Sequence, residues 1–116
     1  MKLQLDHQQL RVRIDEAELA RLLAGTPVAA CTRFAGAFAL QCVLSLGSAA
    51  AALTGQPDAW QIRLPGDAVR ELAGRLPSRE GLRFELGAVA PSDTLTLLFD
   101  VDVRDSARRM KATRER

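Results

Sequence analysis

The sequence predicts one α+β domain of about eight mostly antiparallel strands and two short helices. Three observations support this fold class. Apolar and polar residues alternate along most of the chain, two short stretches carry apolar residues at helical spacing, and the two halves of the chain match each other. Joining two such halves favours a curled sheet or a barrel with a pseudo-two-fold axis, because closure removes exposed strand edges. An open α+β sandwich is the alternative architecture.

The length and composition indicate a single globular domain. With 116 residues and a hydrophobic fraction of 47%, the chain can form a core without metal ions or disulfides. The expected organisation is a domain over 1–103, with pseudo-repeats over about 1–46 and 50–103, followed by a basic tail over 104–116. No apolar run approaches the ~18 residues of a membrane span, and the opening lacks the pattern of a signal peptide. A cytoplasmic protein without membrane contact is therefore expected.

Strands are predicted wherever apolar side chains recur at every second position. The clearest alternation covers residues 10–14, 38–46, 60–64, 82–86 and 95–103, and weaker alternation covers 2–6, 28–34 and 50–54. Side chains of the apolar phase should form a common core. The members predicted from this parity are Leu10, Val12, Ile14, Phe34, Leu40, Trp60, Ile62, Leu64, Phe84, Leu97 and Phe99.

Two helices are predicted from capping residues and apolar spacing. Asp15 and Glu18 are placed as in a capping box, and Gly25 ends the helix that follows. Asp67 is the expected N-cap of the second helix, which Pro77 ends. The buried stripes expected are Leu19, Leu22 and Leu23 in the first helix and Val69, Leu72 and Ala73 in the second. Each helix is too short to be stable alone and must pack on a sheet.

The two halves of the chain match at an offset of fifty residues. In this match, residues 12–14 align with 62–64 and the apolar stripes of the two helices align with each other. Thr32-Arg33-Phe34 aligns with Leu82-Arg83-Phe84. The long apolar strands that follow match at an offset of about fifty-seven, which places an insertion near 88–93. Each half would then run strand–strand–helix–strand–strand. Coincidence between short amphipathic elements is the alternative, but the shared element order, arginine positions and helix stripes favour duplication.

The chain opens with Met1-Lys2-Leu3-Gln4-Leu5-Asp6-His7-Gln8-Gln9 and the alternating Leu10-Arg11-Val12-Arg13-Ile14, and it later carries Ile62-Arg63-Leu64-Pro65 before its second helix. These segments resemble a family of small, uncharacterised bacterial and archaeal proteins. Its members begin with a Met-Lys strand, Asn-Ser, an apolar–Arg–apolar–Arg–apolar strand and a helix. The resemblance covers about the first hundred residues and implies a shape without an activity. This chain departs from the pattern at three places. Gln8-Gln9 stand where Asn-Ser is usual, Asp15 stands where Thr is usual, and Asp100-Val101-Asp102-Val103 stand where the final strand of relatives often has Glu-Lys-Asp-Phe.

Five arginines occupy outward positions of the predicted strands and form the most coherent set of candidate site residues. They are Arg11, Arg13, Arg33, Arg63 and Arg83, and the predicted repeat relates Arg13 to Arg63 and Arg33 to Arg83. Since guanidinium groups bind carboxylates and phosphates in a bidentate manner, a two-fold arrangement would bind a small anionic ligand. Solvated arginines that cover apolar surface and protect strand edges are the alternative.

Other chemistry-bearing residues are few. Asp100 and Asp102 share one strand face and would supply two oxygen ligands to a divalent metal, with solvation or pairing to arginines as the alternative. His7 lies in a predicted turn without a nearby nucleophile, and no phosphate-binding glycine loop or hydrolase motif occurs. Cys42 has the parity of the core and Cys31 points outward, so neither a disulfide nor a zinc site is expected. No catalytic residue and no cofactor are assigned.

The leading interpretation is a non-catalytic, cytoplasmic binding or interaction module, with a homodimer through an uncapped strand edge as an open possibility. One alternative is a small enzyme or sensor that uses the arginines to bind an anionic, phosphorylated small molecule. Another is a weak nucleic-acid binder that acts through the tail. An aromatic content of 4% without tyrosine argues against base stacking.

The tail over 104–116 is expected to be dispensable for folding. It carries six basic residues against two acidic ones and lacks an apolar stripe, so its like charges repel one another. Deletion of residues 104–116 should leave the melting temperature, followed by circular dichroism, within a few degrees of the full chain. A large loss of stability would instead show that the tail docks on the domain.

Overall fold

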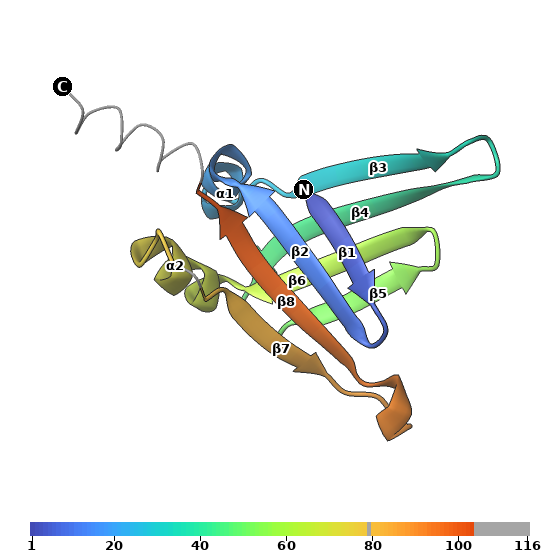
Figure 1. Cartoon of the computed structure of the whole chain (residues 1–116). Helices are drawn as coiled ribbons and strands as arrows, with labels where there is room; N and C mark the ends of the chain where they lie inside the picture. Colours follow the sequence, from blue (N-terminus) through green and yellow to red (C-terminus); the bar gives the residue numbers. More distant parts are fainter. Residues whose placement is uncertain (79, 104–116) are drawn as a thin grey trace.

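The computed structural model describes residues 1–78 and 80–103, which form two four-stranded sheets and two short α-helices (Figure 1). In chain order the elements are β1 (Lys2–Asp6), β2 (Gln9–Asp15), α1 (Glu16–Leu23), β3 (Val28–Phe34), β4 (Phe38–Gly47), β5 (Ala52–Gln56), β6 (Ala59–Pro65), α2 (Gly66–Gly74), β7 (Leu82–Leu86), the 3-10 turn η1 (Pro91–Asp93) and β8 (Leu95–Asp102). The predicted α+β class, with two repeated units, is confirmed. The basic tail over 104–116 lies outside the described residues.

Each sheet joins two antiparallel hairpins through a parallel central pair. Sheet A has the strand order β1-β2-β8-β7, and sheet B has the order β3-β4-β6-β5. The expected antiparallel pairing holds within the hairpins, whereas β2 with β8 and β4 with β6 are parallel. The two sheets stay separate, and β1, β3, β5 and β7 keep a free edge within the described chain. The predicted barrel is therefore wrong, and the open sandwich is the architecture found.

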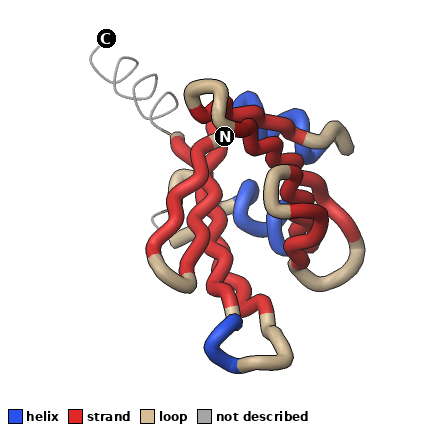
Figure 2. The backbone as a smooth tube through the Cα atoms, turned by 90° about the vertical axis from the view of Figure 1, so that its right-hand side faces the viewer, coloured by secondary structure: helices blue, strands red, loops and turns tan. Residues whose placement is uncertain are grey.

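Each sheet takes one hairpin from each half of the chain. The first half contributes β1–β2 to sheet A and β3–β4 to sheet B, and the second half contributes β5–β6 to sheet B and β7–β8 to sheet A. The strands of the two sheets cross steeply, and both helices lie at the end opposite the β3–β4 turn (Figure 1). Figure 2 shows the two sheets as separate layers. Both helices connect one sheet to the other, so they close only one end of the sandwich.

The strand registers define which residues of the two halves are equivalent. Leu10 on β2 and Trp60 on β6 are equivalent, because the two halves match at an offset of fifty residues. Leu10 pairs with Leu97 on β8, and Trp60 pairs with Cys42 on β4, so Leu97 corresponds to Cys42. The long strands therefore match at an offset of 55 residues, slightly less than the sequence suggested.

The same registers correct the predicted match between β3 and β7. Phe84 faces Leu97 across its hairpin. Ala30 faces Cys42 in the same way, so Phe84 corresponds to Ala30. Arg83 then corresponds to Ala29, and the predicted equivalence of Arg33 and Arg83 is wrong. The reason is length: β3 and β4 have 7 and 10 residues, while β7 and β8 have 5 and 8.

The first helix begins with the capping box that the sequence predicts. The carboxylate of Asp15 accepts a hydrogen bond from the backbone N–H of Glu18 at 2.7 Å, and the side chain of Glu18 accepts one from the N–H of Asp15 at 3.1 Å. In α2 the N-cap is Pro65 without a side-chain cap, so the prediction of Asp67 is wrong; Asp67 lies in the first turn. The buried helix residues include Leu19, Leu22, Val69 and Leu72. None of the described helices is long and apolar enough to cross a membrane.

The core between the sheets consists of the predicted apolar phase, with one exception. The predicted residues that are buried are Leu10, Val12, Ile14, Ile62, Leu64, Leu97 and Phe99, while Leu40, Trp60 and Phe84 are partly buried. The prediction for Phe34 is wrong, because its side chain is 41% exposed and stacks on Phe38 with ring centroids 4.7 Å apart. Phe34 ends β3 and Phe38 begins β4, so the pair lies at the turn of this hairpin, which projects past sheet A (Figure 1).

Truncation of an aromatic side chain should be costly only where both sheets enclose it. Phe99 is fully buried, so Phe99→Ala should lower the free energy of unfolding by about 3–5 kcal/mol in a urea titration. Phe38 is 63% exposed, and Phe38→Ala should cost less than about 1 kcal/mol. Equal losses for the two variants would contradict the burial of Phe99 and the exposure of Phe38.

Candidate functional site

An apolar groove opens between β1 of sheet A and the inner face of sheet B. Its volume is about 300 Å³, and it is lined by Met1, Leu3, Leu5, Ala30, Thr32, Phe34, Leu40, Cys42 and Trp60. These side chains come from β1, β3, β4 and β6, apart from Met1, which directly precedes β1. None of the lining side chains carries a charge, so the groove favours an apolar occupant.

Strand alternation explains why these side chains point into the groove. Ala30, Thr32 and Phe34 are alternate residues of β3 and therefore share its inner face. Trp60 lies on the inner face of β6, and its indole N–H donates a hydrogen bond to the carbonyl oxygen of Pro57 at 2.9 Å. This bond satisfies the polar atom of the indole and leaves the ring as an apolar wall.

The other half of the molecule shows what would fill the groove. By the strand registers, the equivalents of Ala30 and Thr32 are Phe84 and Leu86 on β7. Phe84 and Leu86 are partly buried and pack against the core. β3 thus carries an alanine and a threonine where β7 carries two large apolar side chains, and this difference leaves space over β3.

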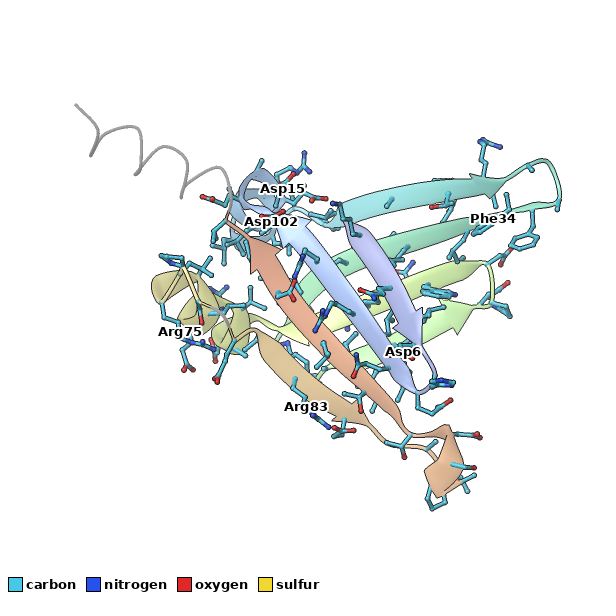
Figure 3. All side chains as sticks on the ribbon, in the orientation of Figure 1. Asp6, Asp15, Phe34, Arg75, Arg83 and Asp102 are labelled. Atoms are coloured by element: carbon cyan, nitrogen blue, oxygen red, sulfur yellow. The ribbon has the colours of Figure 1, made fainter. Side chains whose placement is uncertain are left out.

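Exposed apolar side chains surround the mouth of the groove. Leu5 is 64% exposed, Phe38 is 63% exposed, and Phe34 lies at the outer end of β3 (Figure 3). The turn that joins Phe34 to Phe38 holds Ala35 at φ 52° and Gly36 at φ 86°, and the N–H of Ala37 donates to the carbonyl of Phe34 at 2.8 Å. A clustered group of exposed apolar side chains favours binding at this surface.

The arginines of sheet A are engaged in ion pairs. The Nε of Arg13 lies 2.8 Å from a carboxylate oxygen of Asp100, and the Nε of Arg11 lies 3.7 Å from the other oxygen. Arg83 pairs with Glu85 at 2.9 Å. A hydrogen bond from the hydroxyl of Thr96, and then the guanidinium of Arg83, lower the pKa of Glu85.

The repeat does not bring Arg13 and Arg63 together. Arg13 lies on the outer face of sheet A and Arg63 on the outer face of sheet B, with the core between them. Arg63 faces Ser45 on β4, at the position where Arg13 faces Asp100. Arg33 lies near the exposed end of β3, and the five predicted arginines do not share one pocket.

The two aspartates of β8 have different neighbours on β2. Asp100 binds the two arginines of β2, and Asp102 faces Asp15 across the parallel pair. Within residues 1–78 and 80–103 there is no group of three or more His, Cys, Asp or Glu side chains that could hold a metal ion. His7 lies in the β1–β2 turn at φ 52°, with its Nε2 3.8 Å from Asp6.

The sequence placed the groove residues on the correct faces but did not reveal the groove. Parity assigned Phe34, Leu40 and Trp60 to the inner face, where the structure has them. These side chains stay partly uncovered because Ala30 is small and because sheet A does not extend over all of sheet B. The small size of Ala30 would have been a signal if β3 had been matched to β7 in the correct register.

Comparisons with protein-family models, with curated proteins and with solved structures find no match. The functional assignment therefore depends on the geometry of the groove, the strand edges and the arginines.

The two cysteines should differ sharply in reactivity. Both are free, Cys31 is exposed on the outer face of β3, and burial raises the pKa of Cys42 on β4. Since the thiolate is the reactive form, a thiol reagent at mildly alkaline pH should modify Cys31 rapidly and Cys42 slowly in the folded protein. Spectroscopic titration of Cys31→Ser should show almost no fast thiol, and a fast thiol in that variant would contradict the burial of Cys42.

Proposed function

We propose that this chain is a non-catalytic, cytoplasmic binding module whose recognition site is the apolar groove. The observation that carries the proposal is the difference between the two halves: Ala30 and Thr32 leave open a space that Phe84 and Leu86 fill in the equivalent position. The large side chains at the mouth provide additional apolar contact for a ligand.

The chemistry of the lining selects an uncharged apolar group, such as an aromatic ring or a branched alkyl chain. The hydroxyl of Thr32 and the thiol of Cys42 are the side-chain polar groups at its wall, together with the already bonded indole of Trp60. A volume of about 300 Å³ is at the lower limit for ligand pockets. Burial of apolar ligand surface, at roughly 25 cal/mol/Å², would supply the driving force for binding.

The arginine alternative retains support from one position. Arg63 faces Ser45 rather than a carboxylate, whereas Arg11 and Arg13 are paired with Asp100. An anion would thus find an available guanidinium on sheet B, but the two repeat-related arginines cannot act on one small ligand from opposite faces. The nucleic-acid alternative concerns the tail, which lies outside the described residues.

Filling the groove should abolish binding without unfolding the protein. N-phenyl-1-naphthylamine, a neutral apolar dye, should show saturable fluorescence enhancement with the wild-type chain and quench Trp60, the single tryptophan. Ala30→Phe copies the side chain of the equivalent position and should weaken dye binding at least tenfold. Its melting temperature should equal or exceed that of the wild type, because the new ring buries apolar surface.

Phe84→Ala is the matched control, since it opens the equivalent space on the other side of the molecule. This variant should retain the wild-type dye site and show additional dye binding. Undiminished binding by Ala30→Phe, or no saturable binding by the wild type at the solubility limit of the dye, would refute the groove as the recognition site.

A further inference from the structure

Of the four strand edges within residues 1–78 and 80–103, the free edge of β3 is the least protected. β3 has seven residues, whereas β1, β5 and β7 have five each. From Cys31 onwards every residue of β3 is exposed, and Arg33 is its single charged residue. An edge of this kind presents unpaired backbone N–H and C=O groups to another strand.

The other three edges carry the features that block strand addition. β1 has Lys2 and Asp6 along its edge, and β7 has Arg83 and Glu85. β5 contains Gly55 at φ 105°, which interrupts the regular backbone. Charges and irregularities of this kind prevent edge-to-edge pairing, and β3 lacks them over its first five residues.

The hydrogen bonds of the neighbouring strands show which residues of β3 face its free edge. The N–H of Gln41 on β4 donates to Asp58 at the start of β6 at 2.8 Å, so it points away from β3. The residues on either side of Gln41, which face Ala30 and Thr32, therefore pair with β3. By alternation, the backbone groups of Ala29, Cys31 and Arg33 point outward from the sheet edge.

We propose that two copies of this chain associate through antiparallel pairing of their β3 strands, with Cys31 next to the two-fold axis. This register overlaps all seven residues of both strands and aligns the outward-pointing backbone groups with one another. It joins the two B sheets into one continuous sheet of eight strands. The inference is independent of the groove's ligand and goes beyond the proposed function.

Side-chain chemistry favours a second copy as the partner. In this register Arg33 faces Ala29 of the other copy, so no charge opposes a like charge. The two Arg33 side chains are four residues apart along the strands, about 13 Å, which exceeds the screening length at physiological salt. Phe34 comes to lie opposite Val28 of the other copy, so the pairing covers an aromatic ring that is exposed in one chain.

The test combines mass measurement with cross-linking at Cys31. Sedimentation equilibrium should show a species of twice the 12.6 kDa chain mass in a concentration-dependent equilibrium. A short bismaleimide should convert that species to a covalent dimer, because Cys31 is exposed while Cys42 is buried. Cys31→Ser should abolish the covalent product and retain the dimer.

Proline substitutions distinguish pairing through β3 from other associations. Ala29→Pro removes an outward N–H, which leaves the β3–β4 ladder intact, and it should reduce the dimer fraction and the cross-linked product at least tenfold. Arg83→Pro is the matched control, because the N–H of Thr96 bonds to Gln8 on the β2 side and the Arg83 backbone therefore faces the free edge of β7. Arg83→Pro should keep the dimer fraction of the wild type.

The register itself provides a second readout that does not depend on how well the proline variant folds. In a Cys31→Ser background, Ala29→Cys and Arg33→Cys chains should cross-link when mixed and give at least tenfold less product separately. A wild-type chain that stays monomeric at high concentration, a dimer equally sensitive to both proline variants, or equal cross-linking of the separate cysteine variants would overturn the proposal. Dye binding with a monomeric chain would refute this inference and leave the proposed function standing.

Discussion

The parallel pairing of strands from different halves is the contact on which the rest of the structure depends. β2 pairs with β8 across the length of the chain, and β4 pairs with β6 across the middle. Without its parallel partner, each hairpin would be a two-stranded ribbon, which is marginal in water. With it, the inward side chains of four strands meet those of the opposite sheet, and the two short helices find a buried surface to pack on. Neither half has a complete sheet of its own.

The same pseudo-symmetric framework carries different chemistry on its two outer faces. Sheet A presents ion pairs, such as Arg13 with Asp100 and Arg83 with Glu85. Sheet B has Ser45 in place of the aspartate and Ala29 in place of Arg83, so these positions of its outer face carry small, uncharged side chains. On the inner side, Ala30 in place of Phe84 opens the groove. All three substitutions concern sheet B, which concentrates the binding features of the molecule there.

Local pattern was sufficient to predict the elements, and insufficient to predict how they meet. Period-two alternation located the strands, and Asp15 with Glu18 located the start of α1, because both signals depend on neighbouring residues. The parallel pairs join residues more than eighty positions apart in sheet A, and nothing in local alternation specifies them. The candidate arginines were assigned on the assumption that equivalent residues converge. Because each sheet takes one hairpin from each half, Arg13 and Arg63 instead lie on opposite faces of the molecule. The four-residue error in matching β3 to β7 also hid the equivalence of Ala30 and Phe84.

Because each sheet takes one hairpin from each half of the chain, the two sheets are completed at different times during synthesis. All four strands of sheet B lie between residues 28 and 65, so this sheet can be completed while the second half of the chain is still being made. Sheet A must wait for β7 and β8, which are made after all of sheet B, although its β1–β2 hairpin is made before sheet B. During that interval β2 lacks its parallel partner β8, and Leu10, Val12 and Ile14 belong to a two-stranded ribbon whose apolar surface is prone to association. The apolar surface of β2 is thus protected only when β8 arrives. The β2–β8 pairing, which joins residues far apart in the chain, is therefore expected to form late.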